Sequence, residues 1–124
     1  MSTRSLPFTL GLFLCSISMS AQVPQIITYQ GKVAVQNVPH HGPGQFKFSL
    51  VGGSGAVTFW SNDGTGVGGS EPVAAVPVLV NGGLYSVSLG YTALPNMQPI
   101  PPTVFMNPDL RLRVWFNDGQ HGSQ

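Results

Sequence analysis

Residues 57–64 read Val-Thr-Phe-Trp-Ser-Asn-Asp-Gly, and residues 110–119 read Leu-Arg-Leu-Arg-Val-Trp-Phe-Asn-Asp-Gly. Each stretch is an alternating apolar run that closes in Trp-x-Asn-Asp-Gly. An Asp-Gly pair after such a run predicts a tight turn, because glycine adopts positive φ freely and aspartate tolerates it better than most residues. The two stretches therefore predict a chain built from strands and turns rather than from helices.

Six segments carry strand patterns, and none carries the pattern of a helix of normal length. The clearest alternation, in residues 45–51, is typical of a strand with one buried face. Two later segments are joined by Asn81-Gly82-Gly83, which is the strongest hairpin signal in the chain. Short strands at regular spacing predict an all-β fold, an antiparallel β-sandwich or a barrel-like domain. The predicted strands are residues 26–38, 45–51, 56–60, 73–80, 84–89 and 110–116.

The connection between the last two predicted strands, residues 90–108, contains five prolines. It is predicted to hold one helical turn near residues 103–106. Connections of this length are usually functional or pack over an open end of the fold.

The first 21 residues have the layout of a secretory signal peptide. Arg4 precedes a mostly apolar segment, residues 6–17, which is too short to be a good membrane span, and small residues then offer cleavage after Ser20 or Ala21. Lipid attachment at Cys15 is disfavoured because Leu14 is not small. We predict a signal peptide at 1–21, a module at 22–124 without a membrane span, and a secreted or bacterial cell-surface location.

Charge is scarce in the predicted module. It contains four basic and four acidic residues, since Arg4, the fifth basic residue of the chain, lies in the predicted signal peptide. Attraction to nucleic acid or to anionic membranes has no support in such a balance. Low charge instead favours association with other protein chains.

The second Asp-Gly turn has no returning strand after it. The sequence stops at Gln124, five residues beyond Gly119, although a hairpin turn predicts a partner for the strand before it. A lone apolar strand end would leave an unpaired edge in water. We therefore expect a fragment of a longer protein that lacks the last strand or strands of the domain.

The order of these motifs resembles the N-terminal module of many uncharacterised bacterial exported or surface proteins. The resemblance covers nearly all of residues 22–124 and implies a β-rich structural module, without catalytic residues. In those proteins, fibre-like, collagen-like or tail-fibre-chaperone regions often follow, so other chains or such a downstream region are the expected partners. The matching segments are Ile27-Thr28-Tyr29-Gln30-Gly31-Lys32-Val33, residues 44–50, residues 60–64, residues 81–90 and residues 110–115.

Two groups of side chains have the residue types of metal ligands, but no metal site or cofactor is predicted. Residues 62–66 supply Asn and Asp oxygens that suit calcium, but only Glu71 lies nearby, so a turn in which Asp63 bonds local amides is preferred. His40, His41 and His121 do not have zinc-ligand spacing, and a solvated turn is preferred for the histidine pair.

Exposed aromatic residues are the better candidates for contact with a ligand or a partner. Trp115 lies between Arg111 and Arg113 on the predicted outward face, where it could stack on a sugar ring or on another protein. The alternative is that the arginine stems or missing strands cover it. The candidate contact residues are Trp60, Asn62, Asp63, Arg111, Arg113 and Trp115.

No arrangement in the sequence indicates an enzyme. The serines lack a G-x-S-x-G context, and the glycine-rich residues 64–69 lack the Lys and the following helix of a phosphate-binding loop. We expect a non-enzymatic, exported structural or interaction module. The alternative is a carbohydrate-binding module that uses exposed Trp side chains and the Asn-Asp turns.

Overall fold

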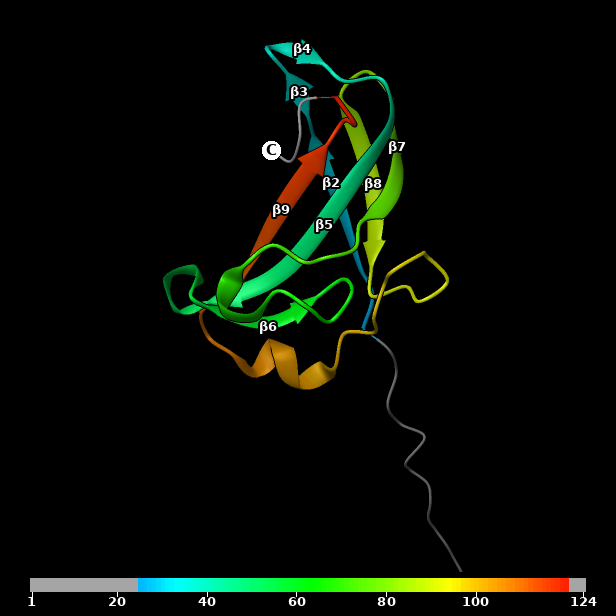
Figure 1. Ribbon diagram of the computed structural model, residues 1–124. Coiled ribbons are helices and arrows are strands. Elements are labelled where there is room, and N and C mark those ends of the chain that lie inside the picture. The colour runs from blue at the N-terminus through cyan, green and yellow to red at the C-terminus, as the bar shows by residue number, and fades with distance from the viewer. Residues whose placement is uncertain (1–24, 121–124) are drawn as a thin grey trace, which may run out of the picture.

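The computed structural model describes residues 25–120, which form antiparallel strands linked by turns and short 3₁₀ helices (Figure 1). The predicted signal peptide, with Cys15, and His121 lie outside these residues. Between residues 25 and 120, no helix has the length and apolarity needed to cross a membrane. The strands are β2 (Ile27–Lys32), β3 (Ala34–Val35), β4 (Val38–Pro39), β5 (Gly42–Gly52), β6 (Val57–Ser61), β7 (Val76–Val80), β8 (Leu84–Leu89) and β9 (Arg111–Asn117), and the 3₁₀ helices are η2 (Gly53–Gly55), η3 (Val67–Gly69) and η4 (Pro102–Met106).

The main sheet is organised around β5, the long diagonal strand of Figure 1. β9 pairs with β5 from Gln45 to Val51. β7 pairs with the first residues of β5, Gly42–Phe46, and β6 pairs with the last, Ser49–Gly52. Because β9 overlaps both of these ranges, β6 and β7 must share the opposite edge of β5. The partner on that edge changes near Phe48.

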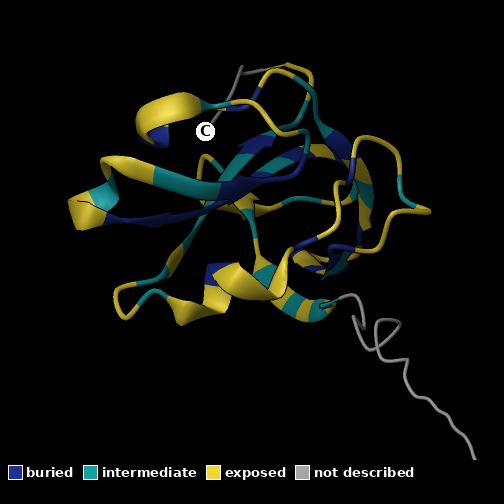
Figure 2. Ribbon diagram, turned by 90° about the horizontal axis from the view of Figure 1, so that it is seen from below, coloured by how far each residue is buried: buried dark blue, intermediate teal, exposed yellow. Residues whose placement is uncertain are grey.

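β2 and β8 form a second antiparallel pair, which faces the main sheet. The rings of Phe46 on β5 and Tyr85 on β8 have centroids 4.3 Å apart, so the core lies between the two layers. Figure 2 shows the buried positions gathered on the strands and the exposed positions mainly on the connections. The core consists of Phe46, Phe48, Leu50, Trp60, Val76, Val80, Tyr85, Val87, Leu89, Met97, Ile100, Val104 and Phe116.

These layers confirm the predicted all-β class. The strand pairs are antiparallel, and no sheet of the described residues closes into a barrel. The alternation in residues 45–51 is confirmed, since Phe46, Phe48 and Leu50 are all buried. Pro77 on β7 lies opposite Gln45, at a position where the two backbones do not bond each other. Its backbone nitrogen, which carries no hydrogen, therefore points away from β5, as expected for an edge strand.

The long connection after β8 covers one end of the core. Met97, Ile100 and Val104 are buried there, and η4 supplies the predicted helical turn. Of the two expectations for this connection, the structure therefore supports packing over an open end of the fold.

The predicted hairpin at Asn81-Gly82-Gly83 is right about the turn and wrong about the strands. Asn81 and Leu84 exchange two backbone hydrogen bonds, of 2.9 and 3.0 Å, and both glycines have positive φ. Beyond this pair the strands separate, because β7 pairs with β5 and β8 pairs with β2. The turn is thus a corner between the two layers.

Gly31 lies directly under a core aromatic ring. It is opposite Tyr85 in the β2–β8 pair, and a Cβ at Gly31 would lie 2.6 Å from the phenolic oxygen and 2.7 Å from Cζ. Burial and the neighbouring Tyr29 phenol raise the pKa of Tyr85, so this side chain stays neutral in the core. The glycine is required here by space rather than by backbone conformation.

Gly31→Ala is expected to lower the free energy of unfolding by about 1–3 kcal/mol, because the Tyr85 ring must move to admit the methyl group. Urea unfolding followed by tryptophan fluorescence would measure this change. Gln30→Ala, at an exposed neighbouring position, is the control and should have little effect. Equal stability of the two variants would contradict the close packing of Tyr85 on Gly31.

Candidate functional site

The first Trp-x-Asn-Asp-Gly copy centres on the side chain of Asn62, which is fully buried. Its Oδ1 accepts a hydrogen bond from the Phe48 N–H at 2.9 Å, and its own N–H donates to the Phe48 carbonyl at 3.0 Å. Its Nδ2 donates to the carbonyls of Ala74 at 2.8 Å and Asn96 at 3.1 Å. The backbone carbonyl of Asn62 accepts from Gln98 at 2.7 Å. Asn62 therefore holds together β5, the entry to β7 and the long connection.

Asp63 is occupied by the loop that it begins. Its Oδ1 accepts from the backbone N–H and the hydroxyl of Thr65, and its Oδ2 accepts from the Ala74 N–H at 2.7 Å. Burial acts to raise the pKa of Asp63, but the hydrogen bonds from Thr65, Ala74 and Ser61 outweigh it, so the pKa lies below its ordinary value. This is the local turn predicted for Asp63. Residues 25–120 contain no cluster of three or more His, Cys, Asp or Glu side chains that could hold a metal ion.

Trp60 is a core residue and not an exposed platform. Its side chain is only 6% exposed, and its Nε1 donates to the Pro99 carbonyl at 3.1 Å. Together, Trp60, Asn62 and Asp63 connect the end of β6 to β5, to the segment before β7 and to the long connection. The tight turn predicted after Trp60 is present, with the Gly64 N–H donating to the Ser61 carbonyl at 3.4 Å. It does not form a hairpin, since β6 pairs with β5 and the chain continues to β7 on the same edge.

The second copy forms local turns at the end of β9. Asn117 Oδ1 accepts from the Gly119 N–H at 2.7 Å, and Asp118 Oδ1 accepts from the Gln120 N–H at 2.8 Å. These are Asx turns, in which a side chain takes the place of a backbone acceptor. The same Asn-Asp-Gly residues thus form buried contacts between segments at the end of β6 and local turns at the end of β9.

Arg113 lies under two glycine loops on the outer face of the main sheet. Its Nη1 donates to the Gly69 carbonyl at 2.8 Å and more weakly to the Gly55 carbonyl at 3.4 Å. A Cβ at Gly55 or Gly69 would collide with the guanidinium or with the other loop, so both glycines are needed for this contact. Arg113 is therefore engaged in the fold.

The other two predicted contact residues of β9 keep some accessible surface. Arg111 is exposed, with a long 3.5 Å contact to Asp109. Trp115 is half-buried and pairs with Lys47, which forms a 2.8 Å ion pair with Glu71. The structure thus places Arg111, Arg113 and Trp115 on one face of β9, away from Trp60, a core side chain.

β9 has a backbone edge that pairs with no strand of residues 25–120. Both backbone groups of Phe48 face Asn62, so Val114, the partner of Phe48, must turn its own N–H and C=O away from β5. Because successive residues of a strand alternate in this respect, Leu112 and Phe116 do the same. These three residues define what we call the free edge of β9.

Partly buried apolar side chains gather beside the free edge. Since β7 and β8 meet at one side of the two layers, β9 and β2 border the other side, which we call the open side (Figure 1). Four of the ten partly buried apolar residues that pack on the core lie on β2 or β9, and three more lie within three residues of these strands in the chain. They are Ile27, Tyr29, Val33, Val35, Leu110, Leu112 and Val114. Sequence reasoning did not predict an opening bordered by β2.

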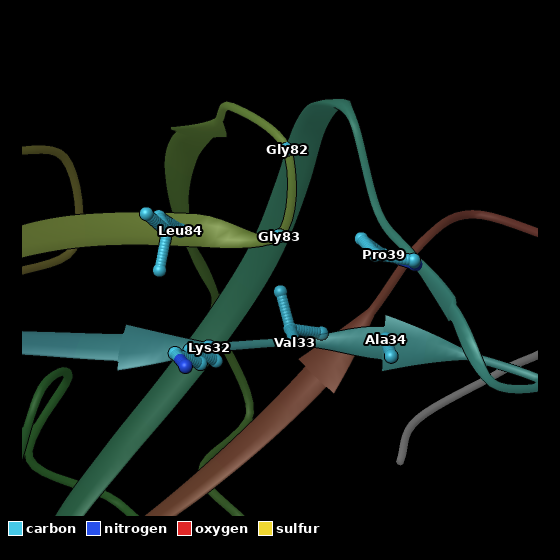
Figure 3. Close-up of a pocket in the computed structure, with 7 residues that line it drawn as sticks. All are labelled: Lys32, Val33, Ala34, Pro39, Gly82, Gly83 and Leu84. Carbon is cyan, nitrogen blue, oxygen red and sulfur yellow. The ribbon is translucent and has the colours of Figure 1, made fainter.

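A separate hollow lies between the end of β2 and the corner turn of β7 and β8 (Figure 3). Its floor is fixed by backbone bonds, with Val33 N–H donating to the Gly83 carbonyl at 2.8 Å. Lys32 is the single charged residue of its lining. The hollow therefore lacks the convergent polar groups of a catalytic site.

The chain belongs to a family described as a domain of unknown function (DUF8740), whose match covers residues 28–124. The match includes every described strand except the first residue of β2. Comparison with curated proteins and with solved structures gives no match.

The two motif copies provide a matched pair of substitutions. Asn62→Ala leaves buried groups of Phe48, Ala74 and Asn96 without partners, and we expect it to lower the free energy of unfolding by about 3–5 kcal/mol. Asn117→Ala removes one exposed local bond and should cost less than about 1 kcal/mol. Urea unfolding of both variants measures the difference. Equal losses would contradict the distinct roles of the two copies.

Asp63 is expected to stabilise the fold in a pH-dependent way. Its pKa is lower in the folded chain than its ordinary value of 3.8, so its contribution is fully present above that pH and is lost as the pH falls through the folded-state pKa. The stability difference between the wild type and Asp63→Asn should therefore shrink below about pH 4. Urea unfolding between pH 2 and 7 tests this, and a constant difference would contradict it.

Proposed function

We propose that residues 22–124 are a non-enzymatic, exported structural module that joins other polypeptide chains through its open side. The observation that carries the proposal is the coincidence of the free edge of β9 with half-buried apolar side chains of the core. An added strand would satisfy the backbone groups of Leu112, Val114 and Phe116 and would cover this apolar surface. Both gains arise at one place.

The chemistry of the rest of the chain supports an assembly role. The predicted module has few charged residues, and the described carboxylates form no cluster suited to metal-assisted chemistry. Export is supported by the signal-peptide layout of residues 1–21. The resemblance to modules that precede fibre-like regions of exported bacterial proteins supports the same role.

Carbohydrate binding remains the alternative function, and the geometry gives it less surface than the sequence suggested. Trp60 and Asn62 are buried, and Asp63 is bonded within its own loop. Trp115 and Arg111 are left as the candidate contacts for a sugar. A glycan array comparing the wild type with Trp115→Ala would support this alternative if the wild type alone retained a glycan.

The proposal predicts uneven amide exchange along β9. In dilute exported protein, the N–H groups of Leu112, Val114 and Phe116 should exchange at least about tenfold faster than those of Arg113 and Trp115, which bond to β5. NMR on protein recovered from the periplasm of a bacterium measures these rates. Retention of the chain in the cytoplasm would contradict export.

Slow exchange at all five positions in the monomer would show that the edge is already covered, and it would overturn the proposed joining through β9. The corresponding amides of β5 serve as the control. Since residues 45–51 of β5 face β9 on one edge and β7, Asn62 or β6 on the other, their amides should all exchange slowly.

A further inference from the structure

The sequence of β9 can pair with itself in an antiparallel arrangement. If the two-fold axis passes beside Val114, Val114 lies opposite Val114 of a second copy, and Leu112 lies opposite Phe116 of that copy. All three residues belong to the free edge, so each would form a hydrogen-bonded pair. Their side chains lie on the core face of β9, and apolar residues would therefore meet apolar residues along the junction.

The outer face of β9 is compatible with the same register. Arg113 would lie opposite Trp115 of the second copy, and Arg111 would lie opposite Asn117. No two like charges would be directly opposite, which matters because such pairs destabilise a sheet. The Arg113 guanidinium stays bonded to the Gly69 carbonyl, so Trp115 of the second copy would lie opposite a side chain that is already held in place.

The other symmetric registers of β9 are worse because of charge or strand length. An axis beside Leu112 would place Arg111 opposite Arg113 of the second copy twice, and an axis beside Arg113 would place Arg113 opposite its own copy. An axis beside Trp115 or Phe116 pairs fewer residues of β9, because the ladder runs into the turn after Asn117, where Gly119 has φ +84°. Charge and strand length together therefore select Val114.

We propose that the partner at the open side is a second copy of this chain, paired antiparallel through β9 with the two-fold axis at Val114. This inference rests on the proposed function. The two main sheets then form one continuous sheet, and the open sides of both copies meet at the junction. A symmetric dimer of this kind uses the same surface on both subunits.

Cysteine cross-linking tests the register. The sequence contains one cysteine, Cys15, so the full chain with Cys15→Ser accepts single thiols. Arg111→Cys mixed with Asn117→Cys should form a disulfide on mild oxidation, because these positions would be about 4.5 Å apart between Cα atoms. Arg111→Cys alone should not, because its two copies would be about 20 Å apart along the strands. Arg111→Cys mixed with Leu79→Cys, an exposed residue of β7, is the control for random collision.

A charge-exchange series separates pairing from misfolding. Asn117→Lys would place a lysine opposite Arg111 twice per dimer and should weaken dimerisation about tenfold. Adding Arg111→Glu to it should restore the affinity to within about threefold. Both variants lack the Asn117 turn bond, so its loss cannot explain the recovery. Sedimentation equilibrium measures the dissociation constants.

Mass, cross-linking and amide exchange together distinguish the outcomes. A dimer that shows the mixed disulfide and the charge rescue supports the proposal. A monomer at about 1 mM with fast exchange at Leu112, Val114 and Phe116 overturns the second-copy partner and leaves the proposed joining through β9 standing. A monomer with these amides protected, whether by another segment of the polypeptide or otherwise, overturns both. A dimer without the mixed disulfide overturns the Val114 register.

Discussion

The divided edge of β5 is the constraint on which the other elements depend. Where β7 gives way to β6, the N–H and C=O of Phe48 are buried and face neither strand. A buried backbone group without a partner is costly, so something must bond both groups at once. Asn62 does so with its amide oxygen and its own N–H, and its Nδ2 reaches the chain before β7 and the long connection. Alanine could not replace it, and an ionised aspartate would have no donor for those carbonyls.

The alternation within strands was predictable because side chains follow burial with a period of two residues. Phe46, Phe48 and Leu50 are a direct example. Strand pairing was harder to predict from the sequence, because a turn fixes the pairing of only the residues beside it. Asn81-Gly82-Gly83 sets one bonded pair, whereas the destinations of β7 and β8 are set by the core contacts of distant residues. The sequence of this turn therefore predicts a hairpin, although in the structure the turn connects strands of two different layers.

The two Trp-x-Asn-Asp-Gly copies show the same limit at the level of a site. Asn62 and Asn117 both follow Trp at two positions and precede Asp-Gly, yet one is buried among backbone groups and the other bonds its own turn. What separates them is the strand beside each, since β6 ends where β5 changes partner and β9 ends at the border of the sheet. Arg113 is a related case, because its carbonyl partners come from Gly55 and Gly69, more than forty residues away.

β7 and β9, two of the three outer strands of the main sheet, differ in how their outer edges are protected. Natural sheets protect exposed edges with proline, inward-pointing charge or bulges. β7 has Pro77, whose missing N–H lies on its outer edge. β9 contains no proline, and Arg113, the charge best placed to discourage a neighbour, is held by Gly69 and Gly55. The outer edge of β7 is therefore protected, whereas the free edge of β9 can accept a strand, on the side where partly buried apolar side chains gather. This asymmetry supports the proposed assembly role, because solubility alone would favour protecting both edges.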